Sequence, residues 1–165
     1  MDFEKLYSDE FHSTYVFIRY MVGNAELAED FTQETFLRIF KAKNLELVTN
    51  ASVYTRQIAR NLVYDYYRKK ALIKWLPFSA SNEQHEITYV PEDWLVQQEQ
   101  RKMLFEALQK LKPLQREIII YRKIEERSIE ETCNILGLTA MKVANTQRSA
   151  MKKLEQLLGG VRDEA

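Results

Sequence analysis

Basic and aromatic side chains alternate along residues 52–74, "SVYTRQIARNLVYDYYRKKALIK", where Asp65 is the single acid. A helical projection at ~100° per residue divides this segment into two faces. One face carries Thr55, Ile58, Ala59, Leu62 and Tyr66, and the other carries Arg56, Arg60, Tyr64 and Tyr67. Cations bind phosphates, and tyrosine rings can stack on unpaired bases, each stack contributing ~1 to 3 kcal/mol. The pattern predicts a helix that binds single-stranded nucleic acid; alternatively, the tyrosines only cover a core edge.

A second candidate for nucleic-acid contact is "GLTAMKVANTQRSAMKK", residues 137–153. Gly137 can adopt the left-handed conformation of a tight turn, and Thr139 is a typical N-cap residue. Ser128 followed three residues later by Glu131 predicts a capping box at the start of a short preceding helix. With the small Cys133 at the crossing, this spacing predicts a helix-turn-helix.

The last helix of this motif has an inner and an outer side. We expect its crossing with the short helix to be filled by Ile129, Leu136, Leu138 and Val143. Three outer side chains could meet base edges: Met141, Asn145 and Arg148. Lys142 and Lys152 would lie nearer phosphates. The alternative is an ordinary helical hairpin whose basic side is only solvated.

The N-terminal third also predicts helices. Apolar residues recur with a period near 3.6 from Phe3 to Val22, and Gly23 and Asn24 end that helix. The following segment, "AELAEDFTQETFLRIFKAK", has its acids in the first half and its bases in the second. This order suits the helix dipole. The acids and Gln33 also form a concentrated polar face that could bind a partner.

Charge is unevenly distributed along a chain that is neutral overall, with 24 basic and 24 acidic residues among 165. The net charges of residues 1–75, 76–100 and 101–165 are +1, −5 and +4. Because salt screens exposed charges beyond about 8 to 10 Å, neutrality does not exclude DNA binding. Pro77 and Pro91 bracket a non-periodic acidic stretch, which predicts a flexible linker over 76–97 between domains at 1–75 and 98–165. A long surface loop within one domain is the alternative.

Composition narrows the class of protein. Glycine and proline are scarce, at four and three residues, which predicts an all-α protein. One cysteine, Cys133, and two distant histidines, His12 and His85, suit neither a disulfide framework nor a zinc site. We therefore expect no metal, no cofactor and no catalytic residue. With no apolar run of ~18 residues and no secretion signal in "MDFEKLYSDE", we expect a cytoplasmic protein that does not insert into the membrane.

Three segments in order resemble bacterial sigma factors. "AEDFTQETFLRIF" resembles region 2.2, and "IARNLVYDYYRKK" resembles regions 2.3 to 2.4. "LQREIIIYRKIEERSIEETCNILGLTAMKVANTQRSAMKKL" resembles region 4. Regions 1 and 3 have no counterpart, so the resemblance is to the small extracytoplasmic-function class, group 4, of the sigma-70 family. It covers roughly residues 5–75 and 98–158. It implies a region 2 bundle of three to four helices and a region 4 helix-turn-helix.

The resemblance implies a transcription initiation factor that binds core RNA polymerase, recognises −10 and −35 elements and melts the promoter. Contacts to the β′ clamp helices would come from Asp30, Gln33 and Glu34. Contacts to the single-stranded −10 element would come from Arg56, Arg60, Asn61, Tyr64, Tyr67, Arg68 and Lys69, with the loop 45–51 beside them. Contacts to the duplex −35 element would come from Thr139, Met141, Lys142, Asn145, Arg148 and Lys152. Further implied partners are the β flap and a membrane-bound anti-sigma factor, which could hold the protein at the inner face of the membrane.

The sequence departs from the family pattern at several positions. Basic residues are common in the family where this chain has Ala144, Thr146 and Ser149, and glycine is common at Glu126. The −35 preference therefore cannot be inherited from the family. Tyr54 also replaces a usual tryptophan. A stand-alone dimeric helix-turn-helix regulator is the alternative function, and a helical protein-protein adaptor is a third.

Overall fold

Helices account for all regular structure in the described part of the chain. The structure, a computed structural model, describes residues 2–75 and 98–162. Within these ranges the all-α prediction is confirmed. The chain separates into two compact units, residues 1–89 and 90–165. The predicted linker, residues 76–97, lies outside the described residues, so its bounds and its flexibility stay predictions.

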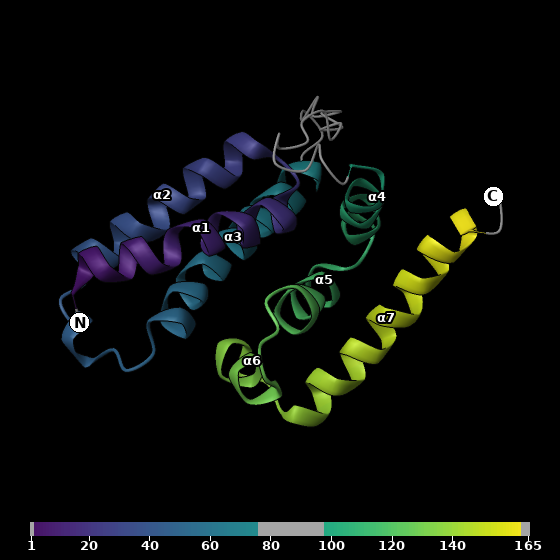
Figure 1. Cartoon of the computed structure of the whole chain (residues 1–165). Helices are drawn as coiled ribbons and strands as arrows, with labels where there is room; N and C mark the ends of the chain where they lie inside the picture. Colours follow the sequence, from purple (N-terminus) through teal and green to yellow (C-terminus); the bar gives the residue numbers. More distant parts are fainter. Residues whose placement is uncertain (1, 76–97, 163–165) are drawn as a thin grey trace. The chain divides into compact units, whose positions relative to one another are not determined.

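The first unit is built from α1 (Phe3–Val22), α2 (Ala25–Lys41) and α3 (Ala51–Trp75), with the short helix η1 (Leu45–Leu47) between the last two. Each of the three long helices packs against the other two, as Figure 1 shows. Their buried side chains follow the helical period and form one apolar core. This core includes Leu6, Phe17, Ile18, Met21, Ala28, Phe36, Ile39, Ala59, Leu62 and Val63.

Local capping signals set the ends of these helices. Gly23, at φ 70°, ends α1 in the left-handed conformation that glycine adopts without a steric penalty. Asn24 begins α2 by accepting a 3.0 Å hydrogen bond from the Leu27 N–H. Asn50 begins α3 in the same way, accepting from the Val53 N–H at 3.1 Å. Such caps satisfy backbone donors that would otherwise lack partners.

The second unit contains α4 (Gln98–Gln109), α5 (Pro113–Ile119), the π-helical turn η3 (Ile120–Ile124), α6 (Ile129–Leu136) and α7 (Ala140–Arg162). Pro113 occupies the start of α5, where its fixed φ and missing N–H suit the first turn of a helix. The buried Arg116 joins α4 to α5, because its guanidinium donates to the carbonyls of Leu108 and Leu111 at 2.8 and 3.1 Å. In Figure 1, α6 turns directly into the long α7.

The helix-turn-helix is confirmed in its outline and corrected in two details. Gly137 has φ 66°, and Thr139 accepts from the Lys142 N–H at 3.2 Å. Ser128 accepts from the Glu131 N–H at 3.0 Å, which is the first half of the predicted capping box. The Glu131 carboxylate instead accepts from Arg127 Nη1 at 3.0 Å, because a charged donor is the stronger partner.

The second correction concerns the crossing between α6 and α7. Ile129, Leu136 and Leu138 are only partly buried, and so is Cys133. The most buried side chains of α6 are Thr132 and Ile135, and Val143 of α7 is also fully buried. Because Thr132 Oγ1 donates to the Ser128 carbonyl at 2.8 Å, a threonine can be buried here without an unsatisfied hydroxyl.

Candidate nucleic-acid and protein interfaces

The predicted acidic face lies on the solvent side of α2. Ala28, Thr32, Phe36 and Ile39 face the core, which directs Asp30 and Gln33 outward. Glu34 is partly exposed and accepts a 3.0 Å hydrogen bond from Arg38, four residues later. Such an exposed i,i+4 pair contributes only ~0.3 to 0.5 kcal/mol to stability, so a partner can replace it. The three side chains therefore form an accessible polar face, here called the α2 face.

Two large apolar side chains extend the α2 face, and the sequence prediction missed them. Leu37 is 45% exposed and Phe40 is 67% exposed. Their positions continue the line of Asp30 and Gln33 at spacings of three and four residues, so they share one side of the helix. The Phe3 ring packs edge-on against Phe40, with 5.2 Å between centroids. Helical spacing was the available signal, because apolar residues recur on the side that carries the acids.

The basic and aromatic face of α3 begins near the middle of the helix, at Arg60. The Arg60 guanidinium lies 4.8 Å from the centre of the Tyr64 ring, in a cation–π arrangement. Asn61 beside them is exposed. The Tyr64 and Tyr67 rings pack edge to face at 6.3 Å, and the Tyr67 hydroxyl donates to the Met21 carbonyl. Arg60, Asn61 and Tyr64 thus form one surface, whereas Tyr67 is anchored to α1.

Arg56 contradicts the predicted division of α3 into two faces. Its side chain is buried, and its guanidinium lies over the Phe17 ring of α1 at 4.7 Å. The physical reason is that α3 packs against both α1 and α2, so its buried arc is wide. Arg56 falls inside that arc, between Val53 and Val63. A helical projection with a single buried face of ordinary width leaves Arg56 on the exposed side, whereas two neighbouring helices widen the buried face of α3.

Two further bases follow on the exposed end of α3. Arg68 and Lys69 are both exposed. Arg68 forms an ion pair with Asp65, three residues earlier, and this hydrogen bond holds the pKa of the Asp65 carboxyl below its ordinary value. Part of the Arg68 charge is therefore compensated, while the Lys69 ammonium has no ion pair among the described residues. The loop before α3 exposes Leu47, at 79%.

The outer side of α7 presents the side chains predicted for duplex DNA. Met141 is 74% exposed, and Asn145, Arg148 and Lys152 continue the same line at i+4, i+7 and i+11. Lys142 is also exposed, next to the Thr139 cap. Inward-facing Val143, Ala150 and Leu154 hold this side outward. An α-helix with such a side fits the major groove in diameter.

A network of polar contacts fixes α7 against the preceding turn. Arg122 Nε donates to Gln147 Oε1 at 3.2 Å, and Gln115 Nε2 donates to Ser149 Oγ at 3.3 Å. Arg127, almost completely buried, pairs with Glu125 and Glu131. Burial opposes its charged form, but the two carboxylates outweigh that effect and hold the Arg127 pKa above its ordinary value. Polar side chains of α5, η3 and α6 thus stabilise the helix-turn-helix.

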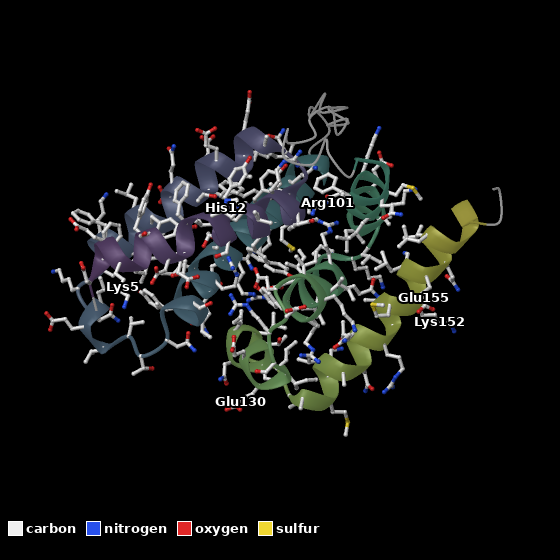
Figure 2. The ribbon with its side chains drawn as sticks, in the orientation of Figure 1. Lys5, His12, Arg101, Glu130, Lys152 and Glu155 are labelled. Atoms are coloured by element: carbon white, nitrogen blue, oxygen red, sulfur yellow. The ribbon has the colours of Figure 1, made fainter. Side chains whose placement is uncertain are left out.

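An open groove runs along one flank of α7, and sequence patterns did not reveal it. It has a volume of about 490 Å³, and Lys123 of η3 lines it together with Arg148, Lys152 and Glu155 of α7. Figure 2 labels Lys152 and Glu155 on the same stretch of α7. Because Lys123 lies far from α7 in sequence, only the packing of η3 brings it to the basic side chains. Lys123 is a further candidate for phosphate contact.

Across the described ranges, no three His, Cys, Asp or Glu side chains are grouped so that they could hold a metal ion. No helix of the described residues combines the length and the apolar character that a membrane crossing requires.

Comparison with known proteins matches the two units separately. Residues 12–73 match Sigma-70 region 2, and residues 107–156 match Sigma-70 region 4. The first match lies within the three-helix unit, and the second within the unit that contains the helix-turn-helix. An all-helical protein with these two units in this order is a transcription factor of the sigma class. The chain belongs to the sigma-70 family of RNA polymerase sigma factors, in its extracytoplasmic-function group.

Relatives support this assignment over most of the chain. It is 28% identical to the ECF RNA polymerase sigma factor BldN of Streptomyces coelicolor, over 94% of this chain and 60% of that protein. It is also 28% identical to the ECF RNA polymerase sigma factor SigX of Bacillus subtilis, over 98% of this chain and 86% of that protein. The chain thus spans less than two thirds of BldN but most of SigX.

A solved structure shares the fold. The sigma factor RpoE of Bartonella quintana, crystallised with the anti-sigma factor NepR, superposes with a TM-score of 0.73 at 22% identity, covering 96% of this chain and 97% of that one. This likeness shows the fold; the predicted sigma factor is confirmed as a family assignment by the matches to regions 2 and 4 and by the relatives. The family is non-catalytic, in agreement with the prediction that this is no enzyme.

Proposed function

We propose that the chain binds core RNA polymerase through the α2 face and directs it to promoters through α3 and α7. The observation that carries this proposal is the order of two matched regions, each presenting an exposed face of the expected chemistry. A polymerase that holds both units at a fixed spacing makes the second DNA contact intramolecular. Tethering of this kind raises overall affinity ~10²- to 10⁴-fold.

The α2 face would dock on the β′ clamp helices through Asp30, Gln33 and Glu34. Leu37 and Phe40 supply the apolar area that a polar face lacks, because interfaces combine a buried apolar centre with a polar rim. The acids then set orientation and salt dependence, whereas Phe40 contributes most of the binding energy. Region 4 would contact the β flap.

The α3 surface would hold the melted non-template strand of the −10 element. Arg60 already stacks on Tyr64, so the pair offers a flat, positively charged platform beside the exposed Asn61. Flipping a base out of the duplex costs a few kcal/mol, and stacking together with phosphate contacts from Arg68 and Lys69 offsets that cost. Tyr67 supports the platform. Arg56 acts through α1 packing rather than by direct contact.

The outer side of α7 would enter the major groove of the −35 element. Base edges would meet the side of α7 that carries Met141, Asn145 and Arg148. Phosphates would meet Lys142, Lys152, Lys123 and the start of the helix at Thr139. On the family resemblance, we also propose a cytoplasmic protein regulated by a membrane-bound anti-sigma factor.

Run-off transcription with purified core polymerase and a library of genomic fragments tests the proposal. We expect initiation at specific sites only when the chain is added. No change in initiation on its addition would refute the proposed function. Tight, palindrome-dependent DNA binding in the absence of polymerase would favour the stand-alone regulator instead.

The division of labour between the units is tested by replacing Phe40 with alanine. At 67% exposure Phe40 contributes to folding mainly through its ring contact with Phe3, whereas as an interface anchor its loss should cost ~2 kcal/mol, about 30-fold in affinity for core polymerase. Asp30→Ala with Glu34→Ala should weaken binding less and flatten its salt dependence. The matched control replaces two exposed acids elsewhere, Asp9 and Glu106. Equal loss in the control would contradict the assignment of the α2 face.

A further inference from the structure

Two of the outward side chains on α7 contact each other. Arg148 Nη1 donates to Asn145 Oδ1 at 3.3 Å, and both residues are exposed. The pair lies on the line that starts at Met141, seven residues before Arg148. At ~1.5 Å rise per residue that line is ~10 Å long, which matches about three base pairs. This line of side chains from Met141 to Arg148 therefore has room for few independent base contacts.

The contact changes what Asn145 can recognise. An asparagine reads adenine by accepting from N6 with its oxygen and donating to N7 with its nitrogen. Here the Asn145 oxygen already accepts from the Arg148 guanidinium through one of its two lone pairs, so reading adenine in this way would require the same oxygen to accept from N6 as well. Arg148 has five N–H donors, of which the contact uses one. Two parallel donors remain, in the fork that matches O6 and N7 of guanine.

Nothing else on this stretch of α7 offers an equivalent fork. Ala144 and Ser149, which flank the pair along the helix, carry no charge, and the Ser149 hydroxyl accepts from Gln115. Lys152 and Lys123 lie along the same groove as Arg148 and supply point charges suited to phosphates. Among the described side chains of α7, Arg148 thus carries the outward-facing guanidinium. Lys152 and Lys123 lie beside it, where they can contact the DNA phosphates.

We propose that Arg148 reads one guanine of the −35 element and that Asn145 is a positioning residue for Arg148, not a separate reader of adenine. The inference rests on the proposed function, because it names the base that the −35 contact of α7 selects. Asn145 fixes the plane of the guanidinium before DNA arrives. Less side-chain freedom is then lost when the two donors meet O6 and N7.

The experiment selects −35 sequences from a randomised pool with four proteins: the wild type, Asn145→Ala, Arg148→Lys and the double variant. Each full-length protein is tested as holoenzyme with core polymerase and also as the free chain. Arg148→Lys keeps the charge but removes the fork. Lys152→Ala is the matched control, and it should lower affinity uniformly across sequences. Thermal unfolding checks that the exposed substitutions leave the fold intact.

We expect the wild type to prefer guanine at one position by about 5- to 150-fold, the range of a bidentate pair worth ~1 to 3 kcal/mol. Asn145→Ala and Arg148→Lys should both reduce the preference at that same position, and the double variant should lose no more than Arg148→Lys alone. A change at a different base pair with Asn145→Ala, or additive losses, would overturn the proposal.

The experiment distinguishes a failure of the proposed sigma function from a failure of the proposal that Asn145 positions Arg148. If the chain does not support transcription, selection by the free chain still reports the guanine position and its response to both variants. A guanine preference that both variants weaken there supports the pair without the sigma mechanism. If the sequences selected by the holoenzyme and by the free chain both show no guanine preference, the proposed roles of Arg148 and Asn145 are overturned.

Discussion

Glu126 adopts a backbone conformation that a side chain disfavours, and replacing it with glycine should stabilise the second unit. It has φ 55°, and it is the one non-glycine residue with positive φ in the described parts of the chain. Its side chain is exposed, and it lies between Glu125 and Arg127 in the segment that follows η3. The Arg127 N–H donates to the Tyr121 carbonyl at 2.8 Å, which holds the turn in this shape.

The expected gain follows from two opposing terms. A residue with a Cβ in the left-handed region costs roughly 1 to 2 kcal/mol, and glycine avoids this cost. Glycine also has more backbone freedom to lose on folding, worth roughly 0.5 to 1 kcal/mol. The difference predicts that Glu126→Gly raises the free energy of unfolding by ~0.5 to 1 kcal/mol. For a unit of this size that is a rise in Tm of about 2 to 8 °C.

Amide hydrogen exchange of the second unit measures this gain without averaging over the first unit. The Glu125 and Arg127 amides, which bond back to η3, should become more protected in Glu126→Gly. Glu126→Ala is the control, because it removes the carboxylate but keeps the Cβ. If alanine stabilised the turn as much as glycine does, charge would be the cause and the conformational reasoning would be wrong.

Two further substitutions test the turn conformation at Gly137 and the ion pair between Arg68 and Asp65. Gly137→Ala should destabilise the helix-turn-helix by ~0.5 to 1 kcal/mol, the same difference between the left-handed cost and the backbone freedom of glycine, since an added Cβ meets no atom within 4 Å; an unchanged melting curve would refute this. Arg68→Ala should raise the pKa of the Asp65 carboxyl, because its main hydrogen-bond donor is lost, and an NMR titration of that carboxyl measures the shift. A depressed pKa stabilises the fold above the unfolded pKa and loses that effect as pH falls through the folded value, so wild type and variant should converge in stability only in acid.

Helix positions and most helix ends could be predicted from the sequence, because their causes are local. A cap or a left-handed glycine acts within about four residues, so Gly23, Gly137 and Thr139 identify the ends of their helices. The order of the two segments that match sigma-70 regions 2 and 4 could also be predicted from the sequence. The outward side of α7 followed from helical spacing, since one buried stripe faces one compact set of neighbours.

The tertiary structure decided which side chains of each face are accessible and which are already engaged. Arg56 is buried because α3 has two helical neighbours, and no spacing rule counts neighbours. Lys123 lies in the α7 groove only because of how η3 packs within the second unit. Glu131 has two candidate local partners, the Ser128 N–H and Arg127, and residue spacing does not decide between them. The contact between Arg148 and Asn145 depends on side-chain rotamers rather than residue types. Side-chain partners depend on distances across the fold, whereas the sequence pattern reports only the period within one helix.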